Sequence, residues 1–181
     1  MMSKYIRSGF IFVVGFIISC SNPTNPTDSS KLFYSSFEQN EQPDSSQWKL
    51  YNLSHWQFVS DTPPTGGKWA LELEAEWGPV QRITTTIPLL EGSHKYRIAW
   101  WGKAIGFAGG AELYTVTVDT SVLLGTVQVT DSDWRSYMID MIVEKADYDS
   151  LLLSLDGGFS HLVEGKTYFD LVSIQLDPLN N

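Results

Sequence analysis

The stretch Tyr96-Arg-Ile-Ala-Trp-Trp101 decides the fold, because a large apolar side chain recurs at every second residue. Successive side chains of a β-strand point to opposite faces of the sheet. Tyr96, Ile98 and Trp100 are therefore expected in the core, with Arg97, Ala99 and Trp101 on the opposite face. A helix would instead place apolar residues three and four positions apart, and no long stretch of that period occurs.

The same alternation extends outward from this strand in both directions along the chain. Short apolar or alternating runs are separated by Gly, Pro, Asp and Ser, which is typical of all-β domains. The residues expected to face inward are Leu71, Leu73, Tyr137, Ile139 and Met141, and those expected to face outward are Glu72, Glu74 and Asp140.

Roughly ten strands in one domain predict a two-sheet antiparallel β-sandwich of the jelly-roll kind. No internal repeat and no second domain are evident. The predicted strands cover residues 32–37, 48–51, 56–59, 69–73, 80–87, 96–101, 113–118, 123–129, 135–143, 151–155 and 168–176.

The first residues have the layout of a secretory signal peptide, which we assign to residues 1–19. Lys4 and Arg7 precede an apolar run over residues 10–18, followed by a small residue and a cysteine. This run has about half of the roughly 20 residues that a membrane-spanning helix needs. A cleaved leader is therefore favoured over a permanent transmembrane helix.

The segment Ile17-Ile-Ser-Cys20 resembles the lipobox of bacterial lipoproteins. The resemblance implies that Cys20 is acylated and becomes the new N-terminus, which would attach the protein to a membrane through lipid. Cys20 is the one cysteine of the chain, so it has no partner for an internal disulfide. Ser21 stands where an acidic residue would favour retention at the inner membrane, so the expected location is the outer membrane.

Residues 20–30 are expected to form a flexible tether, residues 31–177 the folded domain and residues 178–181 a short tail. The tether holds two prolines and, after Cys20, no apolar residue to bury. The whole chain has a formal net charge of −9, and loss of Lys4 and Arg7 with the leader would change it to −11. Such a charge argues against nucleic acid as a partner, because nucleic acids attract basic surfaces.

Six motifs follow one another along the predicted domain. They are Ser-Phe-Glu at 36–38, Gly-Gly-Lys-Trp-Ala-Leu-Glu-Leu at 66–73, Trp-Gly-Pro-Val-Gln at 77–81, the stretch 91–104, Trp134 with Tyr137, and Tyr-Phe-Asp-Leu-Val-Ser-Ile at 168–174. In this order and spacing they resemble the galactose-binding-like jelly rolls, in particular the carbohydrate-binding modules allied to cellulose and xylan binders. The resemblance covers about residues 31–177.

In those modules a structural calcium ion is held by the Glu of the first motif and the Asp of the last. The resemblance therefore implies a calcium site formed by Glu38 and Asp170, with backbone carbonyls near Gly67 and Lys68. Calcium prefers six to eight oxygen ligands, which such a set can provide in part. The alternative is that Glu38 is a solvated strand end and that Asp170 bonds to a turn.

Sugar recognition needs aromatic faces and polar groups that bond to hydroxyls. Trp77 is the first candidate, since it stands where the resembling xylan binders carry a stacking aromatic, and Arg82 lies just beyond it. Trp101 is the second, on the same strand face as Arg97. Both tryptophans have an alternative as packing residues, because β-sandwiches bury many aromatics.

The sequence carries no motif of a known catalytic site. His55, His94 and His161 are scattered, and there is no nucleophile elbow or phosphate-binding loop. Carboxylates are numerous, but none lies in a motif that marks a glycosidase pair. We therefore expect a non-enzymatic surface lipoprotein that binds poly- or oligosaccharide. The alternative is a structural or protein-interaction lipoprotein of the cell envelope with the same fold and possible envelope protein partners.

Overall fold

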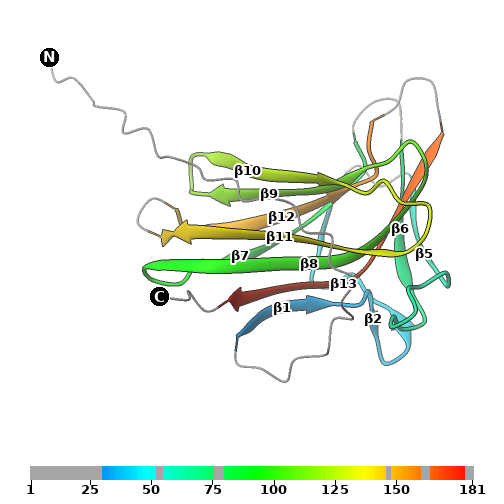
Figure 1. Cartoon of the computed structure of the whole chain (residues 1–181), viewed down its shortest axis with the longest axis horizontal. Coiled ribbons are helices and arrows are strands. Elements are labelled where there is room, and N and C mark those ends of the chain that lie inside the picture. The colour runs from blue at the N-terminus through cyan, green and yellow to red at the C-terminus, as the bar shows by residue number, and fades with distance from the viewer. Residues whose placement is uncertain (1–29, 52–54, 76–79, 146–147, 160–163, 178–181) are drawn as a thin grey trace, which may run out of the picture.

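The computed structural model describes residues 30–51, 55–75, 80–145, 148–159 and 164–177, and this part of the chain is built from strands. Its regular elements are thirteen strands, and all except β2 and β3 correspond in order to the strands that the alternating pattern predicts (Figure 1). They are β1 (Lys31–Ser35), β2 (Glu38–Gln39), β3 (Gln42–Pro43), β4 (Lys49–Tyr51), β5 (Trp56–Val59), β6 (Ala70–Glu74), β7 (Arg82–Pro88), β8 (Ser93–Gly106), β9 (Gly110–Val116), β10 (Ser121–Gln128), β11 (Arg135–Glu144), β12 (Ser150–Asp156) and β13 (Gly165–Asp177).

Two antiparallel sheets form the layers of the sandwich, so the predicted fold class is confirmed. One sheet has six strands in the order β11-β8-β13-β6-β5, with β1 paired to β13. The other has five strands in the order β10-β9-β12-β7-β4. Sequence neighbours such as β7 and β8 lie in different sheets, so the chain crosses repeatedly between the layers, as it does in jelly rolls. Figure 1 shows β10 and β1 at opposite borders of the molecule.

The core between the sheets contains the residues that alternation placed there. Tyr96 and Ile98 are fully buried and Trp100 is 1% exposed. The rings of Trp100 and Tyr137, which face each other on β8 and β11, stack at 5.8 Å. Leu71 and Leu73 are also fully buried, and Ile139 and Met141 pack against the core.

The side chain of Glu72 points away from the core but is nevertheless buried. It alternates with Leu71 and Leu73 as predicted, yet it is only 3% exposed. Lys166 lies 2.8 Å from its Oε1 atom, and the side-chain amide of Gln57 donates to the same oxygen. The outer face of this sheet is thus covered by paired polar side chains, whose cross-strand partners are not evident from one strand alone.

The short hairpin of β2 and β3 was not predicted. Each of these strands has two residues, which is too few for alternation to be visible. The connecting residues Asn40 and Glu41 both have positive φ angles, 52° and 62°. Two successive left-handed residues are typical of a two-residue hairpin turn.

One end of the sandwich is closed by closely apposed glycines. A Cβ atom on Gly165 would lie 1.9 Å from the carbonyl oxygen of Phe107, and one on Gly109 would lie 1.9 Å from that of Asp156. Only glycine allows the backbone to approach this closely. At the opposite end, the backbone N–H of Leu176 donates to the carbonyl of Ser30 at 2.8 Å.

No helix long and apolar enough to cross a membrane occurs in the described ranges.

Candidate functional site

A groove crosses the outer face of the five-stranded sheet. Its volume is about 530 Å³, within the range of roughly 300 to 1,000 Å³ that small-molecule sites occupy. Residues from all five strands line it, so it runs across the strands rather than along one of them. The lining residues are Tyr51, Val80, Arg82, Thr84, Tyr114, Ser121, Leu152 and Ser154.

The strand register arranges the outward side chains of this sheet in rows. Directly opposed residues of antiparallel strands share one face, so the pairings define which side chains are neighbours. The rows are Leu123–Tyr114–Leu152–Thr86, Thr126–Glu112–Ser154–Thr84–Lys49 and Gln128–Gly110–Asp156–Arg82–Tyr51.

The first row is mostly apolar and the other two are mostly polar. Leu123 is 48% exposed beside Tyr114, while Tyr51, at the end of the third row, is 41% exposed. The ammonium of Lys49 lies 4.9 Å from the centre of the Tyr51 ring. The face therefore offers two aromatic rings near the borders of a polar floor.

Glu112 is the centre of the polar contacts in the groove. Its Oε2 atom lies 3.0 Å from the Nη2 atom of Arg82 and accepts a hydrogen bond of 2.7 Å from the Tyr114 hydroxyl. Burial, together with that hydrogen bond to Glu112, raises the pKa of Tyr114. The tyrosine thus stays a neutral donor, and Arg82, Glu112 and Tyr114 form one connected set.

Two further polar atoms at the groove have no protein partner among the described residues. These are Nε of Arg82 and Oγ of Ser154, both of which are buried. A buried polar group without a hydrogen bond carries a desolvation cost. Water or a ligand hydroxyl in the groove would remove this cost.

Asp156 lies in the middle of the third row, between Gly110 and Arg82. Its Oδ1 atom accepts a hydrogen bond of 2.9 Å from the backbone N–H of Gly158. Burial raises the pKa of Asp156 to about 6; the negative charge of Glu112 acts in the same direction, whereas the N–H groups of Gly158 and Gly110 and the charge of Arg82 oppose it.

Of the predicted ligand-binding residues, the structure places Arg82 in the groove. Trp77 falls in segment 76–79, outside the described residues, and its role stays a prediction. The segment ends directly before Val80, which lines the groove.

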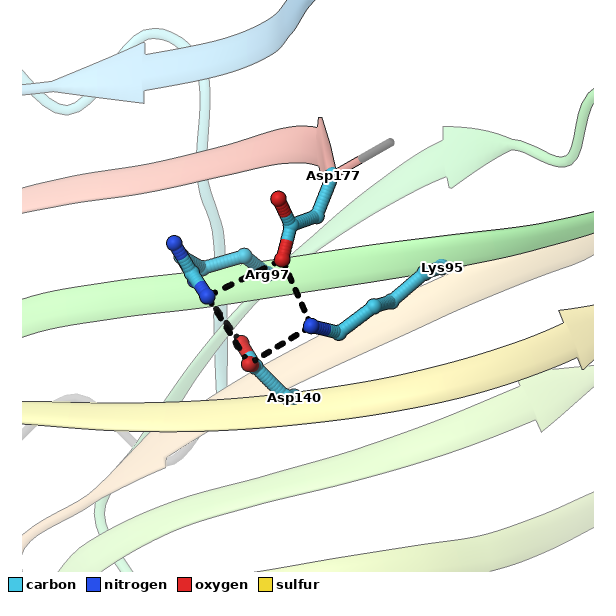
Figure 2. Close-up of polar contacts among 4 residues, drawn as sticks. All are labelled: Lys95, Arg97, Asp140 and Asp177. Atoms are coloured by element: carbon cyan, nitrogen blue, oxygen red, sulfur yellow. Dashed lines mark hydrogen bonds and ion pairs between the residues drawn. The ribbon is translucent and has the colours of Figure 1, made fainter. Parts of the chain in front are cut away.

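Arg97 and Trp101 lie on the other sheet, on the outer face of β8, so they do not share a surface with Arg82. Arg97 belongs to a closed ring of four charges with Lys95, Asp140 and Asp177, which Figure 2 shows. Each cation in this ring contacts both carboxylates. The indole N–H of Trp101 is buried and has no partner among the described residues.

The residues implied for calcium do come together. The carboxylate of Glu38 accepts a hydrogen bond of 2.6 Å from the backbone N–H of Lys68. A Cβ atom on Gly67 would lie 1.9 Å from Oε1 of Glu38, and one on Gly66 would lie 2.5 Å from Oδ2 of Asp170. Both carboxylates therefore approach the same glycine turn, formed by Gly66 and Gly67, while their role as calcium ligands stays a prediction.

The chemistry of this cluster fits a hard cation. Asp170 is fully buried, and its Oδ2 atom has no hydrogen-bond partner among the described residues. Burial raises the pKa of Asp170 to about 8, opposed by the N–H of Leu171 and increased further by the charge of Glu38. The described residues include no group of three or more His, Cys, Asp or Glu side chains arranged for a metal. Backbone carbonyls and water would have to complete the oxygen shell, as is common for calcium.

Sequence reasoning missed most of the polar and aromatic residues in and beside the groove. Tyr51, Glu112, Tyr114, Ser154 and Asp156 come from three strands, and each is a single polar or aromatic residue alternating with buried ones. Alternation predicts that they face outward. It does not reveal which strands are neighbours, and the groove exists only through that pairing.

Comparison with known proteins gives matches of structure alone. A scan against protein-family models finds no match, and a search of curated proteins finds none either. The xylan-binding domain CBM22-2 of Xyn10C from Paenibacillus barcinonensis is similar with a TM-score of 0.57 and 12% identity, over 81% of this chain and 99% of that one. The tandem CBM22-1–CBM22-2 domain of the same enzyme gives a TM-score of 0.61 and 14% identity, over 86% and 52%.

A second kind of module is also similar. TmCBM61, solved in complex with β-1,4-galactotriose, gives a TM-score of 0.52 and 14% identity, over 73% of this chain and 90% of that one. Identities this low show a shared fold and leave function to the residues of the site. This chain is therefore a jelly-roll β-sandwich whose fold is similar to that of these carbohydrate-binding modules.

Proposed function

We propose that this protein is a non-catalytic binding module that holds an oligosaccharide segment of a polysaccharide in the groove of the five-stranded sheet. The observation that carries the proposal is the groove itself, which spans all five strands and combines tyrosine rings with a connected polar set. The similar modules named as binding xylan and β-1,4-galactotriose support it.

The shape of the groove suits a linear chain of sugars. Neighbouring strands lie about 4.8 Å apart, so the distance from β10 to β4 is about 19 Å, enough for several pyranose rings. Tyr114 and Tyr51 provide faces for the apolar sides of the rings. Arg82 and Ser154 have hydrogen-bonding atoms without partners among the described residues, and these can bind sugar hydroxyls.

We further propose that the module is displayed at the cell envelope. The lipobox-like segment ending at Cys20 supports a lipid anchor, and Ser21 supports the outer membrane. We also propose a structural calcium ion at Glu38 and Asp170, supported by the convergence of the two carboxylates on one glycine turn. Such an ion would link the segment after β1 to β13. Strand β13 belongs to the six-stranded sheet, whereas the groove lies on the five-stranded sheet.

Calorimetric titration of the chain from Ser21 onward tests the binding function. Xylohexaose and β-1,4-galactotriose serve as probes, after a glycan array has surveyed other polysaccharides. We expect Tyr114→Ala and Glu112→Gln each to weaken binding about tenfold or more, because stacking and a charged acceptor are lost. Ile142→Ala, which removes a 65% exposed side chain on the other sheet, is the control and should bind normally.

The experiment also separates the alternative function. If no glycan binds the folded protein, the role as a carbohydrate-binding module is wrong, and a structural or protein-docking role in the envelope takes its place. If a glycan binds but Tyr114→Ala and Glu112→Gln leave its affinity unchanged, the groove is the wrong site.

A further inference from the structure

Asp156 is a titratable residue on the outer face of the five-stranded sheet, directly beside the groove-lining residue Arg82, and the proposed sugar contacts do not use it. Arg82 on β7 faces it directly, and Gly110 on β9 faces it from the other side. Among the described residues, the charged and titratable groups that act on it are Arg82, Glu112 and Tyr114. Its own hydrogen bonds come from the backbone N–H groups of Gly158 and Gly110.

The charges of these groups do not cancel when Asp156 is ionised. Two carboxylates, those of Asp156 and Glu112, then share one guanidinium, that of Arg82. The ion pair of Arg82 is formed with Glu112, at 3.0 Å, so the charge of Asp156 is the one in excess. The raised pKa of Asp156, about 6, agrees with this geometry.

We propose that the groove is a proton-linked binding site, in which protonation of Asp156 strengthens the binding of a neutral oligosaccharide. The inference rests on the proposed function and adds its regulation.

Protonation of Asp156 is expected to strengthen binding because of the way water solvates its charge. Water in the open groove partly solvates the excess negative charge, and a neutral ligand laid over the floor displaces that water. Displacement costs more when Asp156 is charged than when it is neutral. A ligand that disfavours the charged form must bind more tightly to the protonated form, and the complex must take up a proton where the free protein is ionised.

The test measures the affinity of the chain from Ser21 onward at about pH 5 and about pH 7.5, on either side of the titration. Calcium is kept saturating, and the probe is whichever of xylohexaose and β-1,4-galactotriose binds more tightly. We expect tighter binding at about pH 5, by about tenfold for each unit by which the bound sugar raises the pKa of Asp156.

Asp156→Asn is the decisive variant. Its amide oxygen can still accept the hydrogen bond from Gly158, but its side chain does not ionise. It should bind equally well at both pH values, with the affinity of the unmodified protein at about pH 5. Asp133→Asn, which changes an exposed carboxylate outside the groove lining, should keep the pH dependence.

A second measurement does not need the variant to fold. The binding heat of the unmodified protein near pH 7, measured in buffers of different ionisation enthalpy, should reveal proton uptake. Affinity independent of pH with no proton uptake overturns the proton linkage and leaves the glycan-binding function standing. A pH dependence that persists in folded Asp156→Asn assigns the proton to another group and also overturns it. Absence of binding at both pH values overturns the proposed function, and the linkage with it.

Discussion

Arg97 and Asp140 face each other across β8 and β11 and are joined by two hydrogen bonds. Nε of Arg97 donates to Oδ1 of Asp140 at 2.9 Å, and Nη2 donates to Oδ2 at 3.0 Å. Such a two-point contact fixes both side chains, because the planar guanidinium matches the carboxylate. The pair ties the edge strand β11 to the centre of the six-stranded sheet, and Lys95 and Asp177 close the ring around it (Figure 2).

Asp140→Asn should lower the free energy of unfolding by about 1 to 2 kcal/mol near neutral pH, since the side chains are partly exposed. The hydrogen bonds from Arg97 hold the pKa of Asp140 below its ordinary value. Its stabilisation is therefore present above the unfolded-state pKa, about 4, and is lost as pH falls through the lower folded-state pKa. Urea unfolding between about pH 7 and pH 3 should show a weaker acid dependence in the variant. An unchanged loss of stability between about pH 7 and pH 3 in Asp140→Asn would contradict the role of this ion pair. Asp133→Asn is the control.

Gly165→Ala should destabilise the fold strongly, by about 2 to 4 kcal/mol, because its Cβ atom would overlap the Phe107 carbonyl. Gly125→Ala is the matched control. Nothing lies within 4 Å of a Cβ atom at Gly125, so this change should cost less than about 0.5 kcal/mol. Chemical denaturation of the two variants compares them directly. Equal stabilities would mean that the closed end of the sandwich can open at little cost.

Calcium should raise the melting temperature of the chain from Ser21 onward. A ligand that binds only the folded state stabilises it by about 2.7 kcal/mol at a hundred times Kd. Glu38→Ala and Asp170→Ala should each remove that shift, whereas Glu91→Ala, far along the chain and exposed, should keep it. Melting curves that coincide with and without a chelator would speak against an exchangeable ion.

Cys20→Ala should leave an unprocessed precursor without lipid, because acylation precedes cleavage in the lipoprotein pathway that the lipobox-like segment resembles. Metabolic labelling with a fatty acid, followed by membrane fractionation, measures both steps. Processing between residues 19 and 20 with lipid still attached to the variant would refute the anchor.

Trp77→Ala should weaken glycan binding at least tenfold while leaving the fold intact, if the indole stacks on a sugar as the resembling xylan binders suggest. If Trp77 instead packs in the core, the substitution should cost about 3 to 5 kcal/mol of stability. Calorimetric titration and thermal melts of the same sample distinguish the two. Lower stability with unchanged affinity would remove Trp77 from the binding site.

The fold was predictable because alternation is a local signal. The alternation of Tyr96, Ile98 and Trp100 predicts a strand and its buried face without any knowledge of the neighbouring strands. The groove was largely hidden, because Glu112 meets Arg82 only through the pairing of β9 and β7 with β12, which no single strand encodes. Arg82 was proposed because it follows the motif at 77–81, and the structure places it in the groove, whereas Arg97, proposed for the same role, lies on the other sheet.

The hydrogen bond between Leu176 and Ser30 brings the two ends of the described part of the sandwich together. The domain is therefore suited to insertion into a surface loop of a host protein, because its two junctions with the host would lie side by side. The same closeness allows the two ends to be joined and the chain to be reopened in the exposed β9–β10 hairpin, where Val118 is 94% exposed.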